Sequence, residues 1–217
     1  INLIGVAISN AAFPKLTERL GEGRDDLFRS DLRSILRVII WLALPTAAIT
    51  FFTRGYVVHF IRNTGDPLMA GILGALCIAI LFRIVYHMAA RAFYAQQDTK
   101  TPLYISFVSI TLNVVLAIVL SMTFNMGAYD IAWAQSVVAV VEVAILFVVM
   151  ERRMPKLFNK TFVGAIWRMV VAAVVTSVVC YMAVLMLPFR ELDNSFYSAF
   201  PRFMVIVMVS FLTYGVV

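Results

Sequence analysis

Charged residues are scarce in this sequence and are missing altogether from long stretches of it. Asp, Glu, Lys and Arg make up 14% of the 217 residues, whereas 62% are hydrophobic. A soluble domain carries about 25% charged and about 45–50% apolar residues. No charged residue or histidine lies between Thr101 and Tyr129 or between Met169 and Phe189. Such runs are too long for core strands and match the roughly 20 residues with which a helix crosses a bilayer, so the composition predicts a membrane protein.

Cysteines and clustered acids are also few, and both shortages exclude kinds of site. Cys77 and Cys180 each stand alone in an apolar run, so neither a zinc site nor a redox pair is predicted. Asp25 and Asp26 are the only adjacent acids in the connections, whereas enzymes that act on polyprenyl phosphates need clustered carboxylates for Mg²⁺. We therefore expect no metal or other cofactor, and a membrane-embedded enzyme is disfavoured.

The apolar runs predict an all-α fold, a polytopic transmembrane helix bundle of about six spans plus a partial one. They lack the period-two alternation of a membrane β-barrel, and helices satisfy their own backbone groups in lipid. No linker divides residues 1–217, so we expect one membrane domain. Because Ile1 is not a start Met and the last run is short, we expect a piece of a longer protein. The predicted spans are 1–14 (partial), 35–53, 68–94, 103–123, 130–150, 163–187 and 203–217 (truncated).

Lys and Arg are distributed unevenly between alternate connections. One set of three connections carries thirteen of the eighteen, and the alternate set carries four. The positive-inside rule places the first set in the cytoplasm. Basic residues at the ends of apolar runs meet lipid head groups, so the net charge of +6 predicts no nucleic-acid partner. The rich connections are 15–37, 91–100 and 152–168, and the other four residues are Arg54, Arg62, Arg190 and Arg202. Within the first, the mixed charges and leucines of 15–34 predict an amphipathic turn lying on the membrane surface.

The polar segment QQDTKTP interrupts two apolar runs and predicts a tight cytoplasmic hairpin. Pro102 suits the first turn of a helix, Thr101 can cap that helix, and Asp98 lies where an acid complements helix amides. Phe93 and Tyr94 lie where aromatic belts form at the membrane surface. The residues that define this hairpin are Arg91, Phe93, Tyr94, Asp98, Thr101 and Pro102.

The order of these residues carries a resemblance to a known family. RAFYAQQDTKTP resembles the raFYAlqDtrTP hairpin of the MurJ (MviN) lipid II flippases, which belong to the MOP exporter superfamily. AAFPKLTERLGEG and LRVIIWLALPTAAI resemble the family's segments around two prolines, which are Pro14 at a helix end and Pro45 at a helix kink. Asn113 matches an Asn of the following helix. The resemblance covers residues 7–150 well, and Thr17 and Glu18 depart from the family's usual Ser and basic residue.

The resemblance implies the C-terminal part of a fourteen-helix flippase fold, with lobe helices in 1–150 and the last two helices in 163–217. It implies a multi-pass protein of the bacterial cytoplasmic (inner) membrane that flips an undecaprenyl-diphosphate-linked muropeptide by alternating access for cell wall synthesis. Expected partners are that lipid, membrane lipids and cell-wall synthesis proteins. The family's key cavity arginines match no position here, so none is assigned. The alternatives are another MOP-type exporter of a polyprenyl-linked oligosaccharide and a non-transporting membrane scaffold.

Four polar residues inside the predicted spans are candidates for the transport cavity. Arg83 and Glu142 lie at similar depth, about 12–14 Å inside the cytoplasmic ends of their helices, so we expect them to form an ion pair. That pair either holds the bundle together or lines the cavity. His87 follows Arg83 by one turn and shares its face. Asn113 is either an interhelical hydrogen-bonding residue or a ligand for the transported molecule.

Overall fold

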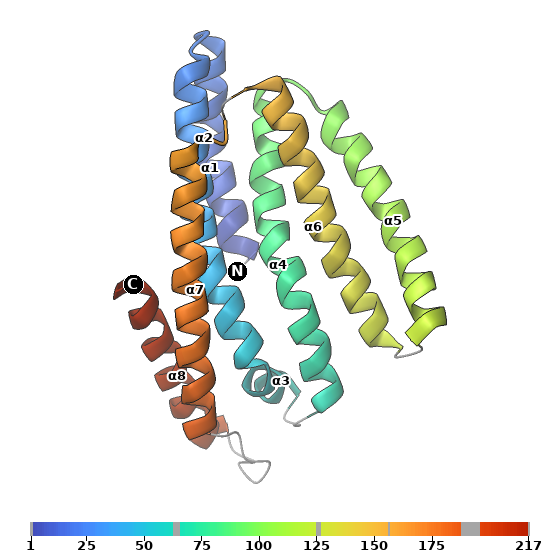
Figure 1. Ribbon diagram of the computed structural model, residues 1–217, viewed down its shortest axis with the longest axis vertical. Helices are drawn as coiled ribbons and strands as arrows, with labels where there is room; N and C mark the ends of the chain where they lie inside the picture. Colours follow the sequence, from blue (N-terminus) through green and yellow to red (C-terminus); the bar gives the residue numbers. More distant parts are fainter. Residues whose placement is uncertain (1, 63–65, 125–126, 156, 188–195, 217) are drawn as a thin grey trace.

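A computed structural model describes residues 2–62, 66–124, 127–155, 157–187 and 196–216 of the chain. Within these residues the fold is entirely helical, as predicted (Figure 1). Six of the helices are long and apolar enough to cross a membrane, which confirms a polytopic bundle. The helices are α1 (Asn2–Gly21), α2 (Asp25–Phe52), α3 (Arg54–Arg62), α4 (Pro67–Ala95), α5 (Lys100–Phe124), α6 (Ala128–Arg153), α7 (Lys160–Met186) and α8 (Phe196–Val216).

The long helices run alternately up and down, with α4 in the middle of the bundle (Figure 1). Helix α4 packs against α1, α2 and α6, while α5 lies at one edge against α6, and α7 and α8 lie at the other edge. The three connections that are rich in Lys and Arg lie at the same end, and α3 lies at the opposite end. This agrees with the prediction that alternate connections lie on the same side of the membrane. The assignment of the basic end to the cytoplasm stays a prediction. Lys156 and Arg190, which entered that count, lie outside the described residues.

The region 15–34 is a projecting pair of helices, so the prediction of a surface-lying turn was wrong. Helices α1 and α2 continue to a short turn at the basic end, because apolar side chains pack between them: Leu16, Phe28 and Leu32 are fully buried. Charges also pair across the two helices, with 3.1 Å between Lys15 Nζ and Asp31 Oδ1. Mixed charge with interspersed leucine is equally typical of a helical hairpin that projects from the membrane.

Two further details of the helix boundaries differ from the sequence predictions. Pro14 lies inside α1, which continues to Gly21, so the prediction that it ends a helix was wrong. Pro45 lies inside α2 and is buried, as expected of a proline within a span. The predicted connection 54–67 contains the short helix α3, whose Tyr56 hydroxyl donates a hydrogen bond to the Leu187 carbonyl at 2.5 Å. This bond joins α3 to the end of α7.

Candidate functional site

A polar pocket lies between α4, α5 and α6, within the part of the bundle predicted to cross the membrane. Its volume is about 190 Å³. Polar side chains inside a bilayer are costly unless they meet partners or water, so a pocket of this kind is a candidate functional site. Three of the four residues predicted for the cavity contribute to its wall. The lining residues are Arg83, Ser106, Ser109, Ile110, Asn113, Val114, Gln135, Val138, Ala139 and Glu142.

The predicted ion pair between α4 and α6 is confirmed. Arg83 Nη1 lies 3.5 Å from Glu142 Oε2. The Glu142 side chain is 6% exposed and that of Arg83 is 38% exposed, so the carboxylate is buried while the arginine side chain is partly exposed. Ser106 of α5 donates a hydrogen bond to Glu142 Oε1 at 3.2 Å, and its hydroxyl also lies 2.7 Å from the Tyr86 hydroxyl. One carboxylate therefore connects all three helices.

A second polar contact joins α5 to α6 farther from the basic end. Asn113 Nδ2 donates to Gln135 Oε1 at 2.9 Å, so Asn113 forms an interhelical hydrogen bond, while a role as a ligand for the transported molecule stays a prediction. Sequence reasoning missed Gln135, Ser106 and Ser109. Helical spacing could have found them, because positions 106, 109 and 113 of α5 share one face, as do positions 135 and 142 of α6. Polar residues repeating on one face of an otherwise apolar span indicate a buried polar seam.

His87 does not join this pocket. It is absent from the lining residues, and its ring packs 5.8 Å from the ring of Tyr86, centroid to centroid. Among the residues that the structure describes, no group of three or more His, Cys, Asp or Glu could hold a metal ion. The pocket instead offers hydrogen-bond donors from Arg83 and Asn113 and acceptors from Glu142 and Gln135.

The hairpin QQDTKTP ends α4 and begins α5 through specific hydrogen bonds. The Gln97 and Asp98 amides donate to the Tyr94 and Phe93 carbonyls, and Gln97 takes a φ of 59°. This is the Schellman arrangement that ends a helix. Asp98 Oδ1 then accepts from the Lys100 and Thr101 amides, each at 3.0 Å. Asp98 is therefore the capping side chain, and the prediction that Thr101 caps the helix was wrong because Thr101 already lies inside α5.

The same aspartate ties the end of α6 to the hairpin. Arg153 Nη1 donates to Asp98 Oδ2, and Arg153 Nη2 donates to the Thr101 hydroxyl at 2.7 Å. The Arg153 guanidinium carbon lies 5.5 Å from the ring centroid of Phe93, which is fully buried and therefore not part of an aromatic belt. We call Phe93, Asp98, Thr101 and Arg153 the hairpin clamp. It joins, at the basic end, the three helices that enclose the pocket.

Charge and hydrogen bonding hold the Asp98 carboxylate in its ionised form. The hydrogen bonds from the Thr101 hydroxyl and amide, together with Arg153, lower the pKa of Asp98 to about 2. The Asp98 carboxylate of the hairpin clamp therefore stays ionised at any physiological pH. Tyr94, in contrast with Phe93, is exposed as predicted for an interfacial aromatic residue. Arg91 packs over the Phe13 ring at 5.7 Å and so joins α4 to α1.

Comparison with known proteins places this helical arrangement in a family. The family profile described as "Lipid II flippase MurJ" matches residues 1–207. The chain belongs to the lipid II flippase MurJ family. MurJ proteins are flippases rather than enzymes, and membership places this chain among multi-pass proteins of the inner membrane, in agreement with its six candidate spans.

Curated MurJ relatives are similar over most of this chain but are much longer. The chain is 26% identical to a probable lipid II flippase MurJ of Thermotoga maritima over 166 residues, which is 74% of this chain and 33% of the relative. It is 24% identical to a protein of the same description in Rhizobium meliloti over 190 residues, which is 85% of this chain and 35% of the relative. The chain thus spans about a third of the length of these MurJ relatives.

A solved MurJ structure shares the fold. A structure titled "Lipid II flippase MurJ, inward closed conformation" superposes with a TM-score of 0.69 and 18% identity, covering 99% of this chain and 43% of that one. The arrangement of α1 to α8 is therefore that of part of a MurJ fold. The roles of Arg83, His87, Asn113 and Glu142 in transport stay predictions.

Proposed function

We propose that this chain is the C-terminal part of a protein that moves lipid II from the cytoplasmic to the outer leaflet for peptidoglycan synthesis. The family match across residues 1–207 carries the proposal. The transported molecule would be an undecaprenyl-diphosphate-linked muropeptide. The names of the relatives above favour this substrate over another polyprenyl-linked oligosaccharide.

We propose further that the pocket of Arg83, Asn113 and Glu142 faces the transport pathway. The pocket supports this role because six of its ten lining side chains are polar although it lies within apolar spans. A charge buried in a membrane is expected to face a cavity or a partner, and here the arginine has both. The pocket would then contribute hydrogen bonds for polar parts of the substrate.

This part of the protein supplies too little positive charge for the diphosphate by itself. A diphosphate that leaves water needs fixed cations to replace its hydration. Arg83 is the one Lys or Arg among the described residues that lines the pocket, and Glu142 already pairs with it. We therefore infer that the remaining two thirds of a MurJ-length protein supply further arginines.

Complementation tests whether transport requires the rest of the protein in addition to residues 1–217. The full-length gene is expected to restore growth to bacterial cells depleted of their own lipid II flippase, and residues 1–217 expressed alone are expected not to. Both proteins are first detected in the membrane fraction by an epitope tag, so that absence of the fragment is not mistaken for inactivity. Rescue by residues 1–217 alone would overturn the inference that upstream arginines are required. Failure of a well-expressed full-length protein would overturn the proposed function.

A further inference from the structure

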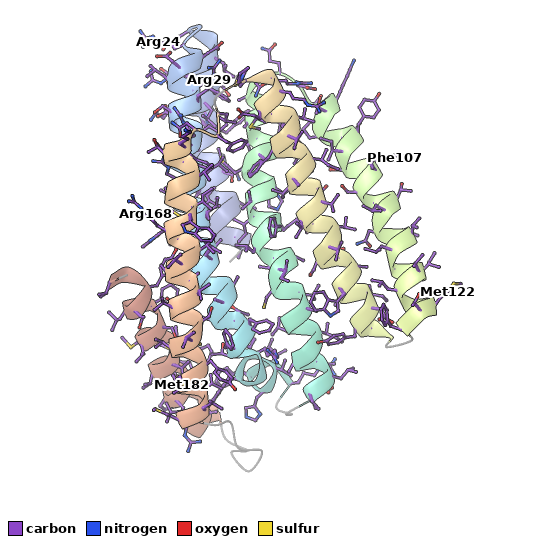
Figure 2. The ribbon with its side chains drawn as sticks, in the orientation of Figure 1. Arg24, Arg29, Phe107, Met122, Arg168 and Met182 are labelled. Carbon is purple, nitrogen blue, oxygen red and sulfur yellow. The ribbon has the colours of Figure 1, made fainter. Side chains whose placement is uncertain are left out.

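Three arginines form a stripe along α2 at the basic end of the bundle. Arg29, Arg33 and Arg37 are spaced by four residues and so lie on nearly the same helix face. Arg29 Nη1 donates to the Pro155 carbonyl at 3.2 Å, and the Arg37 guanidinium carbon lies 5.6 Å from the ring centroid of Phe162. The stripe, which we call the α2 arginine stripe, therefore lies beside the α6–α7 connection and the start of α7. Figure 2 shows Arg29 in this position.

The α2 arginine stripe has more charge and more donors than the described residues around it can satisfy. None of the three arginines forms an ion pair with a described residue. The Nε atoms of Arg29 and Arg37 are buried without an acceptor. The nearest acids form no ion pair with the stripe: Glu151 accepts the Phe158 amide, and Asp25 and Asp26, one helical turn before Arg29, are exposed.

Three cations near the tip of the α1–α2 hairpin, at the same end, do have acidic partners. On the α1–α2 hairpin, Lys15 and Arg19 both pair with Asp31, at 3.1 and 3.5 Å. Arg24 pairs with Glu22 at 3.3 Å. The stripe therefore differs from the neighbouring hairpin tip, where acids compensate the cations. A group of arginines without acidic partners is suited to bind an anion from outside the described residues.

Aromatic residues place the stripe near the membrane surface. Trp41 lies one turn beyond Arg37 and is 46% exposed, and Trp167 of the neighbouring helix is 67% exposed. Tryptophan is enriched at the level of lipid head groups. Arg168, next to Trp167, points away from the bundle (Figure 2). The stripe thus lies at or just above head-group level, on the side predicted to be cytoplasmic.

We propose that the α2 arginine stripe binds the phosphate head group of an anionic membrane phospholipid. The planar guanidinium groups donate paired hydrogen bonds to phosphate oxygens, and the negative surface of the cytoplasmic leaflet attracts them. Each basic residue near such a surface strengthens binding roughly fivefold. Lipid binding here is separate from the transport proposal and does not depend on it.

Lipid titration of the purified full-length protein tests the site. Phosphatidylglycerol is added to protein in phosphatidylcholine-containing micelles, and bound lipid is counted by native mass spectrometry. Arg33→Gln with Arg37→Gln is expected to weaken phosphatidylglycerol binding on the order of 25-fold, because two charges are lost. Arg33→Lys with Arg37→Lys, which keeps both charges, is expected to retain most of the binding and shows that folding is intact.

The matched control removes two positive charges that already form ion pairs on the α1–α2 hairpin. Lys15→Gln with Arg24→Gln is expected to change binding less than twofold, because those cations already have acidic partners. Equal weakening by both Gln pairs would contradict a specific site. Unchanged phosphatidylglycerol binding in the Arg33 and Arg37 variant would contradict it too, and would indicate that upstream residues cover the stripe. Displacement of the lipid by millimolar inorganic phosphate would show that free phosphate, rather than a lipid, is the ligand.

Discussion

Replacing Arg83 with Gln is expected to destabilise the full-length protein by about 2–3 kcal/mol. The change leaves the Glu142 carboxylate, which is 6% exposed, without its ion-pair partner. Breaking a fully buried pair costs about 3–5 kcal/mol, and partial exposure of Arg83 lowers that figure. Glu142→Gln is expected to cost less, about 1 kcal/mol, because the Arg83 side chain is 38% exposed and can be hydrated. The free energy of unfolding of the protein in detergent measures both effects.

The double variant separates an ion pair from two independent contributions. Arg83→Gln with Glu142→Gln leaves no unpaired charge, so it is expected to be more stable than Arg83→Gln alone by about 1 kcal/mol or more. Losses that simply add would contradict the pairing. If the pocket also faces the transport pathway, the double variant regains stability but not activity. Recovery of full activity in the double variant would show that the pair is structural only.

Replacing Asp98 with Ala is expected to destabilise the protein by about 2–3 kcal/mol. The change removes the helix cap, worth about 1 kcal/mol, and leaves Arg153 and the Thr101 hydroxyl without their shared acceptor. Asp66→Ala is the matched control, because Asp66 caps α4 through the Leu68 amide and has no arginine partner in that role. It is expected to cost about 1 kcal/mol. Thermal unfolding of the three proteins measures the difference, and equal losses for the two variants would contradict the hairpin clamp.

The contribution of the Asp98 carboxylate to stability is expected to depend on pH in a definite direction. The pKa of Asp98 falls to about 2 in the folded protein, below the unperturbed value of about 3.9. A lowered folded-state pKa contributes stability above the unfolded pKa and loses it as the pH falls through the folded pKa. The stability gap between the natural protein and Asp98→Asn is therefore expected to be constant above about pH 5 and to shrink between about pH 4 and 2. A gap that stays unchanged down to about pH 2 would contradict the low pKa.

Features that depend on helical depth and period were predictable from the sequence. The positions of Arg83 and Glu142 along uncharged spans were enough to predict their pairing, because membrane helices are nearly straight and an intramembrane charge needs a partner. An interhelical hydrogen bond was one of two roles expected for Asn113, because a polar side chain between membrane helices can bond to a neighbouring helix. Three polar residues of the pocket were not predicted, although the spacing that places them on one helix face was visible: Ser106, Ser109 and Gln135. Single uncharged polar residues are common in membrane-spanning helices, so none of them stood out.

Features that depend on tertiary partners were not predictable. The contact between Asp98 and Arg153 joins residues 55 positions apart along the chain, and no local pattern in the sequence around Asp98 indicates it. Phe93 is buried in the main hydrophobic cluster with side chains of other helices, such as Leu16 and Met150, and the Arg153 guanidinium lies 5.5 Å from its ring centroid. The hairpin of α1 and α2 depends on apolar packing between the two helices, with ion pairs across them, and the mixed charges of residues 15–34 alone fit a surface-lying turn equally well.

Movement of lipid II by the full-length protein tests the central claim most directly. Cells depleted of their own flippase are supplied with the full-length gene, and an enzyme that cleaves the lipid II head group is added outside the cells. Because that enzyme reaches only the outer leaflet, the cleaved fraction of lipid II measures flipping. The account predicts a cleaved fraction close to that of undepleted cells, and a clearly lower fraction when residues 1–217 are expressed alone. A full-length protein that is present in the membrane but leaves lipid II protected would contradict the account.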